Sequence, residues 1–164
     1  LRANLDSRWR QPLSHAESAG LNVQRMGTNP GQYRWLLDAE MQQRAERNID
    51  GMPLVWFERY AESRKQPSRN LLSLRADMAR DRLAGMMFLI HGQAATYQVG
   101  WTTQAGRETN AHHLMLWRGI EALQERGVRL LDLGGINTQR SAGVARFKMA
   151  TGGTVKQLAG SYFL

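Results

Sequence analysis

The chain has 164 residues, of which 42% are hydrophobic and 22% are charged, proportions typical of one soluble globular domain rather than a disordered tail. It has no cysteine, which excludes disulfides, Cys-ligated zinc and a thiol nucleophile, and no apolar run approaches the roughly 20 residues that span a bilayer. The net charge of +8 favours an anionic partner such as nucleic acid, a phosphorylated small molecule or an acidic membrane surface; a generally basic protein without such a partner is the alternative.

The first helix is expected near the N-terminus, where a proline limits its start. Asp6 is a candidate N-cap and Gly20 a candidate terminator, so the helix lies between them. In a helix interior Pro12 would remove a backbone hydrogen bond, whereas it is tolerated in the first turn. The pattern therefore predicts a regular helix that begins near Arg10 or Gln11.

Three more elements are predicted before residue 66. The alternating stretch 21–26 predicts a strand, and residues 29–48 predict a helix that follows an Asn-Pro-Gly turn. The apolar positions of this helix, which we expect on its buried face, are Tyr33, Leu36, Leu37 and Met41. Residues 53–65 predict a further helix with Pro53 at its start.

The second half of the chain is richer in strands. Residues 71–78 predict a strand, and a hairpin that turns around residues 91–94 is predicted from the segments 85–92 and 94–103. The remaining elements are expected as a helix over 110–127, a strand over 128–135, a helix over 141–153 and a strand over 154–164. This order predicts an α/β fold with a mixed sheet.

Two motifs near the ends of the chain stand at a recognisable spacing. The first is SRWRQPLSHAESAGLNV at residues 7–23. The second runs in order through Gly127, the LLDLGGIN stretch, Gly143, Phe147, Lys148, the Gly152-Gly153 pair and Tyr162. Together they resemble the Fem family of peptidoglycan bridge-forming aminoacyltransferases over nearly the whole chain.

The resemblance implies a GNAT-like α/β fold, in which helices flank a mixed sheet, with residues 1–164 as a single acyltransferase domain. Fem proteins carry two GNAT-like halves, and this chain resembles the second. Because the chain also begins without an initiator Met, we expect it to be a piece of a longer protein.

The resemblance also implies an activity, the transfer of an amino acid from aminoacyl-tRNA to an amine of an anionic peptidoglycan precursor in the cytoplasm. Ester aminolysis needs no cofactor and no metal, and a lipid-linked precursor would bring the protein to the membrane surface without a transmembrane segment. Two alternatives stay open. One is an N-acyltransferase that uses acyl-CoA or an acyl carrier protein, and the other is a non-catalytic GNAT-like domain that binds RNA or another anionic partner.

Lys148 is one of only three lysines in the chain and follows Phe147 directly. In the resembled family this Phe-Lys motif lies at the acyl-transfer site. There Lys148 would stabilise the oxyanion formed when an amine attacks an acyl ester, and Phe147 would form a wall that lowers the local dielectric. The alternative is a surface lysine beside a core phenylalanine.

Asp132 is expected at the end of a strand, at the edge of the sheet where ligands bind in α/β folds. It is a candidate to orient an amine or to act as a base. The alternative is a carboxylate satisfied by loop N–H groups. Gly134 and Gly135 follow it, and their lack of side chains would let a substrate approach the backbone.

Three further residues are candidates for substrate binding. Arg10, and less strongly Arg8, could grip a diphosphate with two parallel hydrogen bonds, although a basic helix face is the alternative. Tyr97 lies on a predicted hairpin strand and is expected either to pack in the core or to line the substrate groove.

Residues 101–113, which lie before and at the start of the main helix, bear on which acyl donor the protein uses. A pyrophosphate is usually held by several backbone N–H groups of a glycine-rich loop at a helix N-terminus. Gly106 is the only glycine in this stretch, which argues against acetyl-CoA as the donor. His112 and His113 are adjacent, so they cannot share one helix face as a metal-binding pair at i and i+4 does, and a structural or solvent-facing role is expected.

Overall fold

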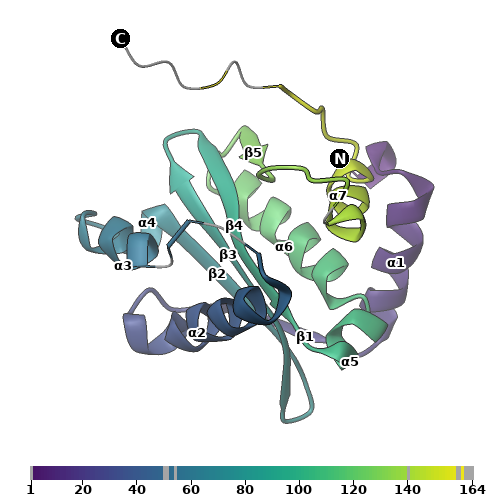
Figure 1. The fold of residues 1–164 in the computed structure, drawn as a ribbon, viewed down its shortest axis with the longest axis horizontal. Coiled ribbons are helices and arrows are strands. Elements are labelled where there is room, and N and C mark those ends of the chain that lie inside the picture. The colour runs from purple at the N-terminus through teal and green to yellow at the C-terminus, as the bar shows by residue number, and fades with distance from the viewer. Residues whose placement is uncertain (1, 50–51, 54, 140, 158–159, 161–164) are drawn as a thin grey trace. The chain divides into compact units, whose positions relative to one another are not determined.

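The computed structural model describes residues 2–49, 52–53, 55–139, 141–157 and 160 (Figure 1). The chain divides into two compact units. One is Pro12–Gly134, and the other combines Leu1–Gln11 with Gly135–Leu164. One boundary in the sequence falls inside the first α-helix, and the other lies between Gly134 and Gly135. The prediction of a single domain over residues 1–164 stays a prediction.

The larger unit contains a sheet whose strands follow the order of the chain. Among the described residues the strands are β1 (Asn22–Met26), β2 (Leu71–Met78), β3 (Asp81–His91), β4 (Ala94–Thr102) and β5 (Leu130–Asp132). The pairs from β1 to β4 are antiparallel, and β5 is parallel to β4. The sheet is therefore mixed, as the sequence predicts.

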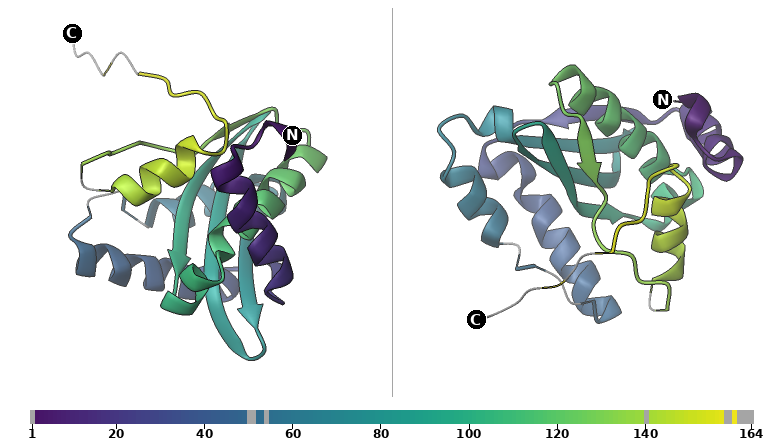
Figure 2. Two further views of the ribbon diagram at one scale, coloured as in Figure 1. Left: turned by 90° about the vertical axis from the view of Figure 1, so that its right-hand side faces the viewer. Right: turned by 90° about the horizontal axis from the view of Figure 1, so that it is seen from above.

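Helices cover both faces of this sheet. The helices of the larger unit are α2 (Pro30–Arg47), α3 (Val55–Glu62), α4 (Pro67–Asn70), α5 (Gln104–Glu108) and α6 (Ala111–Glu125). Helices α2 and α3 lie on one face and α6 on the other (Figure 2). This confirms the predicted α/β fold with a mixed sheet flanked by helices. No described helix is both long and apolar enough to cross a membrane.

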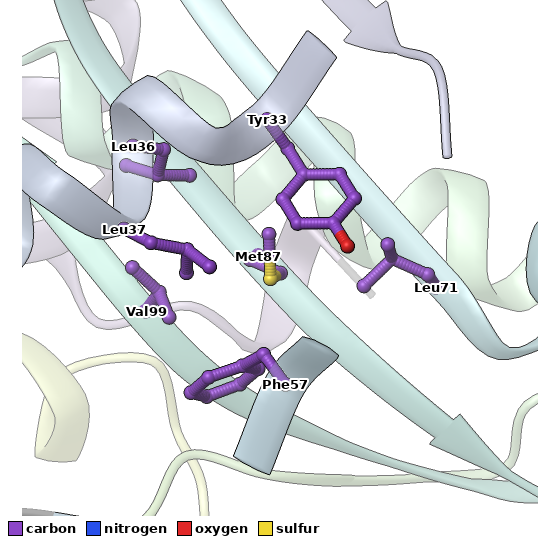
Figure 3. Packing of buried hydrophobic residues seen from close by; sticks show 7 residues of the cluster. All are labelled: Tyr33, Leu36, Leu37, Phe57, Leu71, Met87 and Val99. Atoms are coloured by element: carbon purple, nitrogen blue, oxygen red, sulfur yellow. The ribbon is translucent and has the colours of Figure 1, made fainter. Parts of the chain in front are cut away.

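Buried side chains fill the space between the sheet and α2. Figure 3 shows the cluster, whose members converge from α2, α3 and three strands and are Tyr33, Leu36, Leu37, Phe57, Leu71, Met87 and Val99. Met87 and Val99 are direct partners across β3 and β4, so their side chains share one face of the sheet. This face is closed by α2 and α3.

The opposite face is closed by α6, which approaches the sheet closely at a glycine. A Cβ at Gly119 would lie 2.5 Å from Cζ of Phe88, so no larger residue fits there without displacing that ring. Gly119 and Phe88 are both buried. Adjacent residues of β3 thus serve opposite layers, with Met87 toward α2 and Phe88 toward α6.

Helix α1 (Ser7–Ser18) begins earlier than predicted and holds Pro12 in its interior. Asp6 caps it, because the N–H of Arg8 donates to Asp6 Oδ1 at 2.8 Å. An interior proline costs about 3 kcal/mol, but burial of a side chain such as Leu13 contributes roughly 1.5–3 kcal/mol. Trp9 and Leu13 are both fully buried, and their burial offsets the proline.

Helix α2 also differs from its prediction in which residue it buries. Met41 was expected in the core but is 58% exposed, whereas Glu40 is only 8% exposed. In the sequence alone, either residue 40 or residue 41 could continue the buried face of α2. The Glu40 carboxylate is tolerated in the core because Arg44 donates a hydrogen bond to it at 3.0 Å. The prediction for Met41 was therefore wrong by one position.

Two further differences lie in the second half of the chain. The short helix α5 was not predicted. Its N-cap Thr103 accepts a hydrogen bond from the N–H of Gly106 at 3.0 Å. In the predicted last strand, residues 154–157 and 160 are not in a strand, while 158–159 and 161–164, with Tyr162 among them, lie outside the described residues.

The close approach of α6 to β3 gives a stability prediction. Gly119→Ala should destabilise the protein by about 1–3 kcal/mol because its methyl group meets the Phe88 ring. Thermal unfolding should show a Tm lowered by roughly 3–10 °C for a domain of this size. Gly31→Ala is the matched control, since it is also helical and its Cβ would meet nothing within 4 Å. An equal loss in both variants would contradict the packing argument.

Candidate functional site

Strand β4 has an edge that β5 covers only in part. Residues 94–96 pair with β5, but residues 97–102 continue beyond it (Figure 1), and no other strand of the described chain pairs with them on that side. The register against β3 also shifts here, because Val99 pairs with Met87 and Tyr97 with Phe88, which leaves Gln98 as a bulge. An unpaired strand edge can hold an extended acyl donor or peptide through main-chain hydrogen bonds.

Tyr97 lies beside this edge. Its ring packs against Phe88 with 5.8 Å between centroids, and a Cβ at Gly100 would overlap its hydroxyl group. The side chain therefore runs along the strand from Tyr97 toward Gly100. Burial raises the pKa of the Tyr97 hydroxyl, with the charge of Glu40 as a smaller cause. A role in substrate binding stays a prediction.

A polar cluster on α2, which the sequence analysis did not single out, meets the same strand. Glu40 accepts hydrogen bonds from Arg44 at 3.0 Å and from Gln43 at 2.9 Å. Gln43 also donates to the carbonyl oxygen of Gly100 at 3.3 Å. The i,i+4 spacing of Glu40 and Arg44 indicates an ion pair from the sequence alone, but the sequence does not indicate that this pair lies beside β4.

The segment that leads into α6 uses several of its own backbone donors. The N–H groups of residues 106, 107, 109, 110 and 113 all donate to oxygen atoms within the segment 103–113. A Cβ at Gly106 would lie 2.5 Å from the carbonyl oxygen of Leu83, so this glycine is required for packing against β3. The segment does not present these groups together to a pyrophosphate.

The two histidines of α6 are partly buried, which fits a structural role. The Nε2 atom of His112 lies 3.0 Å from the carbonyl oxygen of Trp101, and because a carbonyl only accepts, Nε2 carries the proton. Burial lowers the pKa of His112, and it lowers the pKa of His113 to about 4, with His112 as a smaller cause. Among the described residues, no group of three or more His, Asp or Glu is placed to bind a metal ion.

The smaller unit holds Lys148 and Phe147 on α7 (Ala142–Met149). The Nζ atom of Lys148 donates to the carbonyl oxygen of Gly135 at 2.9 Å, so the structure brings these two predicted site residues together. The ring of Phe147 packs at 6.0 Å from that of Trp9, between centroids. This contact is also the one expected of a core phenylalanine, and the role of Phe147 as a wall of the site stays a prediction.

Asp132 and Gly134 form a turn at the end of β5. Oδ1 of Asp132 accepts a hydrogen bond from the N–H of Gly134 at 2.7 Å, and the Asp132 side chain is exposed. Gly134 has a φ of 75°, a conformation that favours glycine. This loop contact is the one expected of a structural carboxylate, and the catalytic role of Asp132 stays a prediction.

The two candidate arginines of α1 differ in their surroundings. Arg8 forms a two-pronged pair with Asp6, at 3.1 Å from Nε to Oδ1 and 3.0 Å from Nη2 to Oδ2. This hydrogen-bonded pair lowers the pKa of Asp6 to about 2. Arg10 is exposed. Since Arg8 is already engaged by a carboxylate, Arg10 is the stronger candidate for a phosphate.

Comparison with known families identifies the relationship. A family model described as an acetyltransferase (GNAT) domain matches residues 2–149. The chain belongs to the GNAT acetyltransferase family. No curated protein matches it.

Solved structures share the fold of this GNAT domain at low sequence identity. FemX aligns with a TM-score of 0.70 and 11% identity over 85% of this chain, which spans 50% of FemX. An aminoglycoside acetyltransferase from an uncultured soil metagenomic sample, in complex with sisomicin, aligns with a TM-score of 0.63 and 10% identity over 88% of this chain and 95% of its own. A predicted acetyltransferase from Clostridium acetobutylicum, with acetyl-CoA, gives 0.58 and 13% over 88% and 95%.

These likenesses confirm the predicted GNAT-like fold. Membership of the Fem family within it stays a prediction, because FemX is similar at the level of fold alone.

The partly buried histidines of the GNAT domain predict a loss of stability in acid. Below pH 6.5 the unfolded chain takes up a proton at position 113, while the folded chain resists it until about pH 4. Stability should therefore be full above pH 6.5 and fall between these values. In His113→Gln the decline of Tm with pH should be shallower, and His91→Gln, at an exposed position, serves as the control. An unaltered slope in His113→Gln would refute the assignment.

Proposed function

We propose that this GNAT domain is an aminoacyltransferase, which joins an amino acid from aminoacyl-tRNA to an amine of an anionic peptidoglycan precursor. The observation that carries the choice of donor is the segment 103–113, which leads into α6 and in which five backbone N–H groups donate to oxygen atoms of the same segment. Such an entry is a poor cradle for the pyrophosphate of CoA. The ester of an aminoacyl-tRNA has no pyrophosphate, so this donor does not need such a cradle.

The proposed reaction is aminolysis of an ester. The amine nitrogen attacks the carbonyl carbon, a C–N bond forms, and the ester C–O bond breaks. The proton lost by the amine leaves with the tRNA hydroxyl group. The intermediate carries a negative oxygen, which a nearby cation stabilises.

The proposal gives each candidate side chain one role. Lys148 stabilises the oxyanion from its position beside the Gly135 carbonyl group, and Phe147 excludes water from it. Asp132 acts as the base that takes up the proton of the attacking amine. The exposed Arg10 contacts the diphosphate of the precursor.

The remaining candidates concern substrate approach and location. The Gly134-Gly135 pair lets substrate come close to the backbone, and Tyr97 lines the edge of β4. A lipid-linked precursor would bring the protein to the membrane surface. The donor, a charged tRNA, puts the proposed reaction in the cytoplasm.

A second candidate is an N-acyltransferase that uses acyl-CoA or an acyl carrier protein. It is supported by the alignment with the sisomicin-bound and the acetyl-CoA-bound acetyltransferases, which extends over 95% of each of those chains. The amine chemistry is the same in both candidates, and only the donor differs.

Substitution of Lys148 tests the proposed oxyanion role. In the full-length protein Lys148→Ala should lower kcat by roughly 100-fold or more, since the loss of one oxyanion donor has an effect of that order. Lys156→Ala removes an exposed lysine and should leave kcat unchanged. Steady-state aminoacyl transfer to a nucleotide-linked muropeptide is the measurement. Unchanged turnover in Lys148→Ala would remove this residue from the mechanism.

Thermal unfolding with acetyl-CoA tests the donor. A ligand present at about 100 times its Kd stabilises a protein by roughly 2.7 kcal/mol. For a domain of this size that is a Tm increase of about 5–10 °C. We expect no such increase. An increase of this size that is lost when the pantetheine arm is removed would favour the acyl-CoA candidate instead.

A further inference from the structure

Helix α2 buries a charged residue where an apolar one was available. Glu40 is 8% exposed, and its neighbour Met41 is 58% exposed. Removing a carboxylate from water is costly unless its oxygen atoms are paired. The burial of Glu40 in place of Met41 therefore indicates that its carboxylate is paired in the folded protein.

The partners of Glu40 occupy both of its oxygen atoms. Arg44 donates from Nε to Oε1 at 3.0 Å, and Gln43 donates from Nε2 to Oε2 at 2.9 Å. Arg44 is fixed in turn, because it donates to the carbonyl oxygen of Met52 at 2.9 Å. The side chains of Arg44 and Glu40 are 18% and 11% exposed, so solvent screens this pair only weakly.

Gln43 connects this cluster to the open edge of β4. Its Nε2 atom also lies 3.3 Å from the carbonyl oxygen of Gly100. Both partners of the amide are acceptors, so its NH₂ end must face them, and the orientation of the amide is determined chemically. The carbonyl oxygen of Gln43 is then the end of the amide that can accept from a further group.

The position of Gly100 connects this amide with the strand edge. Gly100 belongs to the part of β4 that extends beyond β5, and the Tyr97 hydroxyl group lies against it. Gln43 is partly exposed. A hydrogen-bond acceptor on a fixed amide therefore stands next to the edge at which an extended donor would lie.

We propose that Gln43 binds the acceptor amine through its carbonyl oxygen, and that Glu40 is a positioning residue that holds the Gln43 amide in this orientation. The inference rests on the proposed acyl transfer to an amine, whichever acyl donor is used. An attacking amine needs one N–H held while its lone pair points at the carbonyl carbon. Gln43 accepts that hydrogen bond and takes up no proton.

The amine-binding role is tested by steady-state kinetics of the full-length protein, with a nucleotide-linked muropeptide as acceptor and charged tRNA or acyl-CoA as donor. Gln43→Met keeps the length of the side chain and removes its hydrogen bonds. It should raise the KM for the acceptor about 10-fold, as expected for one lost hydrogen bond, and leave the KM for the donor unchanged. Gln42→Met, at the exposed neighbouring position, should change neither.

The positioning role is tested by two substitutions of Glu40. Glu40→Asp keeps two carboxylate oxygen atoms that can accept from Gln43 and Arg44, whereas Glu40→Leu keeps none. The acceptor KM should therefore rise in Glu40→Leu and be at least partly restored in Glu40→Asp. If Glu40 only supported folding, Tm would change in both variants, but the acceptor KM would not differ between them.

Several outcomes would overturn the inference. An unchanged acceptor KM in a folded Gln43→Met variant, or a rise in the donor KM instead, removes Gln43 from amine binding. If the Met variant does not fold, Gln43→Ala serves the same test. A wild-type protein that transfers no acyl group to any amine overturns the proposed function, whereas an active wild type with a silent Gln43→Met overturns only this inference.

Discussion

The fold depends on the burial of strand β3 on both of its faces. Residues 83–88 are all buried, and neighbouring residues of this stretch serve the two helical layers in turn. Met87 packs toward α2, while Phe88 meets α6 at Gly119. Since both layers pack on one strand, the positions of α2 and α6 are set by the same backbone. The neighbouring strand β4 pairs with β3 along most of its length, so its position is also set by β3.

Elements with a strong local signal were predictable from the sequence. The continuous apolar run in residues 85–90 identified β3, because a strand buried on both faces has no polar alternation. In α1 and α2 the local sequence is compatible with two arrangements, and tertiary packing determines which one forms. Pro12 is tolerated inside α1 because Trp9 and Leu13 are buried, and Glu40 replaces Met41 in the core because Arg44 pairs with it.

The candidate site was less predictable than the fold. Lys148 was proposed through a family resemblance and Asp132 from its expected place at the end of a strand, and the structure adds their contacts with Gly135 and Gly134. The contact of Gln43 with β4 was not predicted, because its partner is a backbone carbonyl group, which has no signature in the sequence. The entry to α6 was partly predictable. A single glycine suggested a poor phosphate site, but the internal hydrogen bonds of the N–H groups in residues 103–113 required the structure.

The bulge at Gln98 has a consequence for how this protein can vary. It shifts the alternation of β4 by one residue, so that Tyr97 shares the face of Phe88 while Val99 shares the face of Met87. In a regular strand residues 97 and 99 would point to the same side. Removal of Gln98 would make residues 97 and 99 neighbours in a regular strand, and their side chains would still point to opposite sides of the sheet. At this point, therefore, the loss of one residue keeps the two faces of β4 and removes only the bulge, whereas the loss of a residue elsewhere in the strand would turn one part of β4 over.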